Sequence, residues 1–287
     1  MSDAASPRPL LACPSSGQAV ASDPLAPLRA QLARRHPACA VRWVARTGST
    51  NADLLAAARA GRLDSPTLLA TAQQTAGRGR QGRVWRDDAQ TSVLCSLAWP
   101  FAPQHDIRAL SLAAGVWLAQ ALHALGATAV RLKWPNDLLL PHAGQWRKLG
   151  GVLVEVADTA QVRWAVIGFG LNLRTPTDLP QAVGLDAVGL APDRSAVLAT
   201  LAPVLLDGLH GGTRRRHAAL VQWNALHAWA GREVLVREGG QTLCSGIAHG
   251  IDPDGALRVR TAHGERRVLS ADLSLRLAAD PWPDTAK

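Results

Sequence analysis

The feature that most restricts the fold of this chain is a change of pattern at Gly231. Before this residue, apolar stretches with helical spacing alternate with shorter apolar stretches of strand length. After it come only short alternating stretches, "REVLVREGG", "TLCSGIAHGID", "GALRVRTAHG" and "ERRVLSADLSLR", separated by Gly, Asp or Pro turns. The pattern predicts an α+β fold, in which a mixed sheet domain with helices precedes a small all-β barrel.

Hydrophobic spacing and end signals place the elements of the first part. The clearest start signal is Ser49 or Thr50, either of which can cap a helix that Gly61 ends. We expect helices over 28–35, 50–60, 107–125, 194–210 and 213–230, and strands over 40–45, 67–72, 92–99, 129–134, 148–157 and 162–173. The Ala-, Ser- and Pro-rich residues 1–27 are predicted to be a disordered segment.

Composition argues against a membrane protein and a secreted protein. The longest apolar helical stretch, "LAAGVWLAQAL" at 112–122, is too short to cross a bilayer. The N-terminus lacks the basic region followed by an apolar run that marks a signal peptide. The four cysteines have no metal-type spacing and are expected to be inert thiols. We therefore expect a cytoplasmic protein without a membrane partner.

The net charge of +9 raises the possibility of a nucleic-acid partner, but the location of the charge favours a smaller anion. Residues 41–150 carry thirteen Arg and Lys against six Asp, which is most of the excess. Elsewhere the sequence shows neither a basic amphipathic helix nor a zinc-finger pattern. The distribution predicts a site for a small polyanion in this part of the chain.

The stretch "AGRGRQGRVW" at 76–85 contains the spacing Gly-x-Gly-x-x-Gly of a dinucleotide-binding fingerprint. In that fingerprint the third glycine opens a helix, whereas here a short strand is expected over 92–99. The match is therefore interpreted as coincidental. The distinctive content is Arg78, Arg80 and Arg83 interleaved with glycines, which predicts a mobile cationic loop that holds an anion.

Four further stretches stand out, although each has a purely structural interpretation when taken alone. "GSTN" at 48–51 can be a helix cap, and "KWPNDLLL" at 133–140 can contain a plain turn. "KLGGVLVE" at 148–155 and "GFGLNL" at 168–173 can be buried strands in which glycine allows close sheet packing.

In combination and in this order, the cationic loop and these stretches resemble the biotin–protein ligases over roughly residues 42–277. The resemblance implies a mixed-sheet catalytic domain akin to class II aminoacyl-tRNA synthetases, followed by an SH3-like C-terminal domain. On this basis residues 28–230 are expected to be the catalytic biotin- and ATP-binding domain. Residues 231–277 are expected to be the SH3-like domain, and 278–287 a tail.

The resemblance also implies a two-step reaction. The carboxylate of biotin attacks the α-phosphate of ATP, with Mg²⁺, to give biotinyl-5′-adenylate and pyrophosphate. A lysine of a biotin carboxyl carrier protein then takes the acyl group and releases AMP, and the carrier of acetyl-CoA carboxylase is the expected acceptor. Arginines and Mg²⁺ would screen the like charges of the first step, and a loop ordered over the ligand would exclude water. Both a monomer and a homodimer are compatible with the resemblance.

Residue roles follow from the positions that match the family motifs. Arg80, Lys148 and Asp137 are the expected catalytic residues, Asp137 being also the candidate Mg²⁺ ligand and a possible base for the acceptor lysine. The expected biotin-binding residues are Ser49, Thr50, Gln74, Gly77, Arg78, Arg80, Lys148, Gly168 and Gly170. The expected ATP-binding residues are Arg78, Arg80, Arg83, Trp85, Lys133, Asn136, Asp137, Asn172 and Arg276. A loop that covers adenine is expected within 174–192, without assigned residues.

Three alternatives remain beside this interpretation. Lipoate or octanoate ligases and transferases share the catalytic fold, but the cationic loop and "KWPND" favour biotin. A non-catalytic biotin-binding protein would not need Arg80, Lys148 and Asp137 together. Some biotin ligases are also DNA-binding repressors through a domain of about sixty residues. Only 47 residues precede Gly48 here, so we expect no specific DNA binding.

Overall fold

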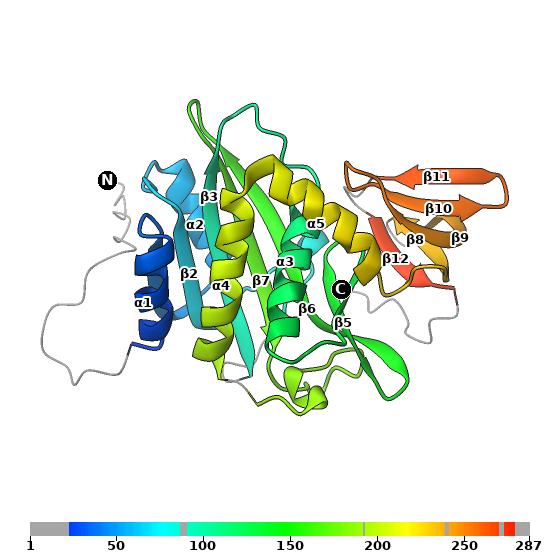
Figure 1. Ribbon diagram of the computed structural model, residues 1–287, viewed down its shortest axis with the longest axis horizontal. Helices are drawn as coiled ribbons and strands as arrows, with labels where there is room; N and C mark the ends of the chain where they lie inside the picture. Colours follow the sequence, from blue (N-terminus) through cyan, green and yellow to red (C-terminus); the bar gives the residue numbers. More distant parts are fainter. Residues whose placement is uncertain (1–22, 87–90, 192, 239–240, 270–272, 279–287) are drawn as a thin grey trace, which may run out of the picture.

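The computed structural model describes residues 23–86, 91–191, 193–238, 241–269 and 273–278. Its main element is a seven-stranded sheet in the order β1-β2-β3-β7-β6-β5-β4 (Figure 1). β1 and β2 are parallel, and the other neighbours are antiparallel. The strands are β1 (Ala40–Thr47), β2 (Thr67–Gln74), β3 (Ser92–Phe101), β4 (Arg131–Lys133), β5 (Asp137–His142), β6 (Gln145–Asp158) and β7 (Arg163–Asn172).

Helices cover both faces of this sheet. α2 packs against β3, β6 and β7, whereas α3 and α4 pack together on the other face, which is the near face in Figure 1. α1 packs on α4, and α5 packs on α3. The helices are α1 (Ala26–Arg35), α2 (Thr50–Arg59), α3 (Leu110–Ala124), α4 (Arg194–His210) and α5 (Gly212–Leu226).

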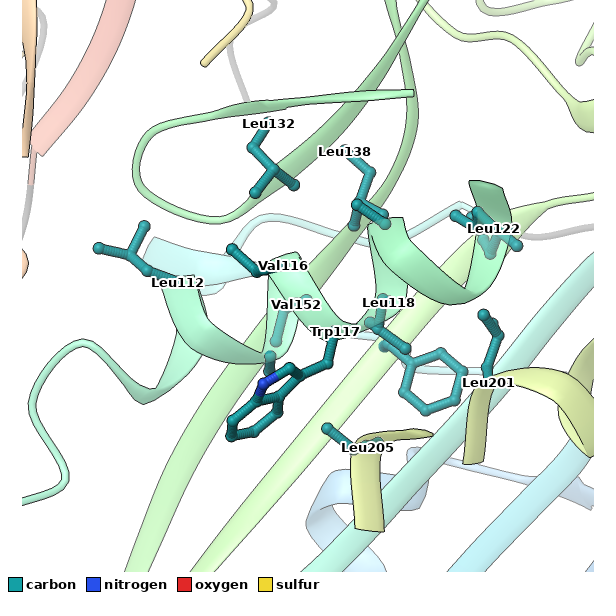
Figure 2. Close-up of a cluster of buried hydrophobic side chains, with 14 of the residues drawn as sticks. Leu112, Val116, Trp117, Leu118, Leu122, Leu132, Leu138, Val152, Leu201 and Leu205 are labelled. Carbon is teal, nitrogen blue, oxygen red and sulfur yellow. The ribbon is translucent and has the colours of Figure 1, made fainter. Parts of the chain in front are cut away.

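The two faces of the sheet are filled by alternate residues of the same strands. Leu97 of β3 and Ile167 of β7 belong to the larger core, whereas Ala98 and Val166 belong to the smaller core around α2. This is the period of two that side chains follow along a strand. Figure 2 shows part of the larger core, where residues of α3, α4 and the sheet meet in one cluster.

A second, five-stranded antiparallel sheet follows in the order β11-β10-β9-β8-β12. It is joined to the first part by a buried hydrogen bond from Trp134 Nε1 to the carbonyl oxygen of Gly255, at 3.1 Å. The strands are β8 (Glu233–Glu238), β9 (Gln241–Ile251), β10 (Leu257–Thr261), β11 (Gly264–Val268) and β12 (Leu273–Leu277). The α+β organisation expected from the sequence is confirmed, with its change of pattern two residues before β8.

The structure differs from the expected elements at three places. The segment expected to be disordered up to residue 27 is ordered from Asp23, because Leu25 is buried and α1 begins at Ala26; residues 1–22 lie outside the described part. The strand expected over 129–134 is only Arg131–Lys133, and a further strand, β5, follows the "WPN" turn. α5 ends at Leu226 rather than 230.

Two expectations from composition can be compared with the described residues. Cys39, Cys95 and Cys244 are free thiols, and burial raises the pKa of Cys39 to about 11; Cys13 lies outside the described part. Within the described ranges no single helix has the length and apolar character to span a membrane. α4 and α5 meet these criteria only as a pair, which is bent by 118°.

Candidate active site

A cleft of about 660 Å³ opens on the α2 face of the seven-stranded sheet. Its floor follows from the sequence of β7. Trp164 and Val166 pack in the core around α2, and the next residues of this face, Gly168 and Gly170, line the cleft. Because glycine has no side chain, neighbouring side chains pack directly on the strand at these two positions, Asn51 at Gly168 and Trp85 at Gly170.

The cleft brings together nearly all the residues that the sequence resemblance singled out. Those that line it are Ser49, Thr50, Gln74, Arg78, Arg80, Arg83, Trp85, Lys133, Asn136, Asp137, Lys148, Gly168, Gly170, Asn172 and Arg276. Gly77 is not part of the lining. A Cβ there would lie 3.0 Å from both Gln74 Nε2 and the carbonyl oxygen of Trp85, so Gly77 permits close packing below the loop.

Uncharged polar side chains form one end of the cleft, which we call the neutral end: Thr50, Asn51 and Ser96, which are buried, and Gln74, which is half-buried. The backbone N–H and the hydroxyl of Thr50 lie 2.8 and 3.1 Å from Gln74 Oε1. The hydroxyls of Thr50 and Ser96 are 2.7 Å apart, and Ser96 donates to Asn51 Oδ1 at 2.6 Å. Ser49 lies at the same end and caps α2, its hydroxyl accepting the N–H of Ala52 at 3.4 Å.

The neutral end is linked to the cationic loop through Glu155 of β6. Asn51 Nδ2 donates to Glu155 Oε2 at 2.9 Å, and Arg78 forms an ion pair with the same carboxylate at 3.4 Å. Both partners of this ion pair are partly exposed, so it contributes little to stability. The ion pair fixes the geometry, because through Glu155 it joins Arg78 at the start of the loop to Asn51 at the neutral end.

The cationic loop turns back on itself with few backbone bonds. Gly79 N donates to the carbonyl oxygen of Arg83 at 2.7 Å, and Trp85 N donates to that of Gly77 at 2.9 Å. The turn itself has Gln81 and Gly82 at positive φ, 59° and 69°. The third glycine of the motif thus starts no α-helix, and β3 follows at Ser92. This confirms that the dinucleotide-binding spacing is coincidental.

Trp85 closes the loop against the sheet. A Cβ on Gly170 would lie 2.6 Å from the Trp85 ring, so the indole occupies the space that this glycine leaves open. Lys148 Nζ lies 5.6 Å from the centre of the same ring, within reach of a cation–π interaction. The position supports a packing role for Trp85 at the base of the loop.

Three charged side chains form the other end of the cleft, the charged end: Lys133, Asp137 and Lys148. Asp137 Oδ1 lies 2.6 Å from Lys148 Nζ, and Oδ2 lies 3.1 Å from Lys133 Nζ. The side chains of Lys133 and Asp137 are 13% and 12% exposed, whereas that of Lys148 is 40% exposed. Lys133 also lies 5.0 Å from the centre of the Trp229 ring.

Burial and neighbouring charge act in opposite directions at this end. Burial alone would raise the pKa of Asp137, but Lys148 and Lys133 outweigh it and hold this pKa well below its usual range. Burial lowers the pKa of Lys133, against the effect of Asp137, and the charge of Arg276 lowers it further. Arg276, from β12, therefore lies within electrostatic reach of the charged end.

The segment after β7 folds back onto Lys148. Lys148 N donates to the carbonyl oxygen of Gln181 at 2.8 Å, and Val183 N donates to that of Lys148 at 2.9 Å. Asn172 Nδ2 donates to the carbonyl oxygen of Val183 at 3.2 Å and secures the same segment. Leu179, Gln181 and Ala182 thereby line the cleft beside Trp146.

The charged end does not form a resident magnesium site. Both oxygens of Asp137, the expected ligand, accept hydrogen bonds from lysine ammonium groups. Across the residues that the structure describes, no three His, Cys, Asp or Glu side chains are grouped to hold a metal ion. A magnesium ion that enters with ATP would find its ligands in phosphate oxygens and water.

Several residues in or beside the cleft are not identified from the sequence. Asn51 lines the cleft and Glu155 lies beside it, and the resemblance assigns a role to neither, although they stand inside the stretches "GSTN" and "KLGGVLVE". Ser96 and Trp146 carry no local signal, because β3 and β6 bring them to the cleft only through strand pairing.

Comparisons with known proteins agree on one family. The model of the "Biotin/lipoate A/B protein ligase family" matches residues 43–172, and that of the "Biotin protein ligase C terminal domain" matches 230–276. The "Biotin--[acetyl-CoA-carboxylase] ligase" of Mycobacterium tuberculosis is 34% identical over 251 residues, which cover 79% of this chain and 85% of that protein. Its namesake from Paracoccus denitrificans is 33% identical over 80% of this chain and 98% of its own.

A bifunctional relative and a solved structure extend this comparison. The "Bifunctional ligase/repressor BirA" of Escherichia coli is 35% identical over 80% of this chain and 72% of that protein. Biotin protein ligase from Aquifex aeolicus, solved in complex with biotin and ATP, superposes with a TM-score of 0.67. It covers 83% of this chain and 99% of its own, at 24% identity, and shows the shared fold.

Proposed function

Because the chain belongs to the biotin/lipoate A/B protein ligase family, we propose that it is an ATP-dependent biotin–protein ligase. It activates biotin as biotinyl-5′-adenylate and transfers the biotinyl group to a lysine of a biotin carboxyl carrier domain, that of acetyl-CoA carboxylase being the expected one. The observation that carries the proposal is the pairing, in one cleft, of a buried neutral end with an ammonium-rich charged end. The site is cytoplasmic in this proposal, where ATP is available.

The neutral end is suited to a small polar ring. Thr50 and Ser96 are buried and line the cleft beside Gly168 of the floor. A ureido ring carries both N–H donors and a carbonyl acceptor, so it can satisfy hydroxyl and amide groups of both kinds. We assign biotin to this end, with Ser49, Thr50 and Gln74 as the residues that contact the ureido group.

The charged end is suited to the first chemical step. A carboxylate oxygen of biotin forms a bond to the α-phosphorus of ATP, and the bond to the bridging oxygen breaks and releases pyrophosphate. Both reactants are anions, so fixed cations that face the transferring phosphate lower the barrier. Lys148 and Arg80 are the residues we assign to this position, with Lys133, Arg78 and Arg83 adding positive potential.

Asp137 has a positioning role in this proposal. Its carboxylate holds both ammonium groups toward one point, which fixes their geometry before the nucleotide arrives. A base role toward the acceptor lysine does not fit, because a carboxylate whose pKa is held low is a weak base at neutral pH.

The second step needs an activated acyl donor. An unperturbed lysine has a pKa of about 10.4, so roughly one in a thousand is neutral at pH 7.4. The neutral amine attacks the acyl carbon of the adenylate, the acyl–phosphate bond breaks, and AMP leaves. The adenylate must be shielded from water until then, and we assign this role to the cationic loop and Trp85.

We assign the adenosine to the wall that Trp146 and Leu179 form on the far side of Lys148. Asn172 holds the 181–183 segment rather than facing the base directly, because its amide donates to the carbonyl oxygen of Val183. Asn136 has a similar role, since its Nδ2 donates to the carbonyl oxygen of Val152 at 2.8 Å.

ATP–pyrophosphate exchange with biotin, lipoate or octanoate as the only added acid tests this function. We expect exchange with biotin alone. Exchange only with lipoate or octanoate would move the protein to the other branch of the family and keep the fold. Absence of exchange with every acid, from folded protein supplied with Mg²⁺, would favour a binding protein without catalytic activity.

A further inference from the structure

We propose that the hydrogen-bond network of Asn51, Ser96 and Thr50 beside the cleft floor is directional, and that Glu155 sets its direction. Asn51, Ser96 and Thr50 form a chain of hydrogen bonds that ends at the cleft. In this chain the Thr50 hydroxyl accepts a hydrogen bond from the bound ring and does not donate one. The inference rests on the proposed function, because it takes the ligand to be biotin, with its two ureido N–H donors.

The direction begins at Glu155, whose carboxylate can only accept hydrogen bonds. Asn51 Nδ2 lies 2.9 Å from Glu155 Oε2 and 3.4 Å from the carbonyl oxygen of Leu153. Two acceptors thus face the same atom of the Asn51 amide, and that atom must be the nitrogen. The amide oxygen of Asn51 then points the other way, toward Ser96.

The next two links follow from the number of protons on each group. Asn51 Oδ1 can only accept, so the single hydroxyl proton of Ser96 is donated to it at 2.6 Å. Ser96 Oγ therefore offers only lone pairs to Thr50, at 2.7 Å. The hydroxyl proton of Thr50 consequently points to Ser96.

The geometry around Thr50 favours the same result. The alternative acceptor for its proton, Gln74 Oε1, is farther away at 3.1 Å and already receives the Thr50 backbone N–H at 2.8 Å. With its proton engaged by Ser96, the hydroxyl presents a lone pair to the cleft that it lines. An N–H group of the ligand is the complementary partner.

The network also lies against the cleft floor and has little freedom to rearrange. A Cβ on Gly168 would stand 2.1 Å from Asn51 Oδ1, so Asn51 packs directly against β7, and Thr50, Asn51 and Ser96 all line the cleft. Asn51 and Ser96 are 4% and 1% exposed. Reversing the Thr50 proton would leave Ser96 Oγ without a donor in a buried place, which is unfavourable.

The Thr50 hydroxyl should therefore favour a ligand N–H group over a ring oxygen of the same size at the same position. Two cyclic carbamate analogues of biotin, each with one ureido N–H replaced by a ring oxygen, serve as probes. We expect one of the two to bind the unaltered protein about tenfold more weakly than biotin or worse, because two lone pairs would face each other. For this weaker analogue, the dissociation constant divided by that of biotin is the measured ratio. A ratio well above one indicates that the Thr50 hydroxyl accepts a hydrogen bond from the ligand and does not donate one.

Isothermal titration calorimetry without ATP gives this ratio for four variants. Ser96→Ala removes the acceptor of the Thr50 hydroxyl proton. The hydroxyl can then donate to the ring oxygen of the analogue, and the ratio should fall to within about threefold of unity. Glu155→Met removes the acceptor for Asn51, and the ratio should fall part of the way. Glu155→Gln keeps an acceptor oxygen but loses the charge that faces Arg78, and the ratio should stay. Asp158→Asn is the matched control, since it removes a carboxylate of β6 from an exposed ion pair with Arg163.

The outcomes separate the inference from the function. Unchanged ratios in both Ser96→Ala and Glu155→Met, with biotin still bound, would overturn the directional network and keep the proposed function. If the ratio falls equally in Glu155→Gln and Glu155→Met, the effect comes from the lost ion pair with Arg78. This result would also overturn the directional network. An unaltered protein that does not bind biotin would overturn both. Thermal unfolding by circular dichroism checks each variant, and if Ser96→Ala does not fold, Glu155→Met decides.

Discussion

The two ends of the cleft are built in opposite ways. At the neutral end, Thr50, Asn51 and Ser96 are at most 4% exposed and bond mainly to one another. At the charged end, Lys148 is 40% exposed and pairs with an aspartate that an incoming phosphate can replace as its partner. A ring without charge is recognised by fixed geometry, whereas a polyanion is recognised by cations that can change partners. Substitutions at the neutral end should therefore alter affinity, and those at the charged end should alter rate.

The largest effect is expected for Lys148→Met, which removes the exposed cation of the charged end. Pyrophosphate exchange at saturating substrates should fall by about 100- to 1000-fold, as for the loss of one transition-state donor. The dissociation constant of biotin, measured without ATP, should change by less than about tenfold. Lys148→Arg keeps the charge and should recover part of the rate. Equal losses in rate and affinity would break the distinction between the two ends.

A second large effect concerns His227, which pairs with Leu132 of β4, next to Lys133 in the sequence. His227 is 6% exposed, and burial lowers its pKa to about 4. Between pH 6.5 and 4 the unfolded chain binds a proton that the folded protein does not, so stability falls as the pH falls. The loss should be about 2.5 kcal/mol between pH 7.5 and 4.5.

Urea unfolding of the unaltered protein and of His227→Phe at both pH values measures this contribution. The variant should show a smaller loss on acidification, and the difference between the two losses belongs to His227. Identical pH dependence in the two proteins would refute the assignment. The exchange activity at pH 7.5 serves as the check that the charged end remains intact.

Gly168→Ala tests the neutral end. The new methyl group would meet Asn51 Oδ1 at 2.1 Å, so the network must shift, at a cost of about 1–3 kcal/mol in biotin binding. This corresponds to a roughly 5- to 150-fold weaker dissociation constant, with the KM for ATP unchanged. Gly115→Ala in α3, where a Cβ would meet only Leu132 at 3.5 Å, is the matched control. A change in the KM for ATP as large as that for biotin would contradict the separation of the ends.

The smallest effect is expected for Ser49→Ala, which tests whether Ser49 contacts biotin in addition to capping α2. Ser49→Ala removes the cap of α2 and should cost about 1 kcal/mol of stability together with some biotin affinity. Asp193→Ala removes the cap of α4, which accepts the Ala196 N–H at 2.7 Å, and should cost a similar stability alone. If both variants bind biotin as the unaltered protein does, Ser49 is a cap and nothing more.

The sequence predicts residues whose signal is local and misses those that depend on strand pairing. The Ser49 cap is visible because its partner is three residues away, and the glycines of β7 are visible as a spacing within one strand. Ser96 has no local signal, since its partners Thr50 and Asn51 lie 46 and 45 residues away. β5 is not predicted from the sequence, because the apolar run Leu138–Leu140 follows Pro135 so closely that the stretch is typical of a turn.

The glycines at 168 and 170 also have a consequence for how this protein can evolve. Every replacement of a glycine adds atoms, and at both positions the added atoms would meet a neighbour at less than 3 Å. Single substitutions there can narrow the range of acids that the cleft admits, but they cannot widen it. A descendant with a broader range must arise through changes elsewhere in the wall, such as a smaller residue at Trp85 or Trp146. Substitutions in the floor can therefore only restrict the substrate range, whereas smaller residues in place of the indoles that border the cleft can broaden it.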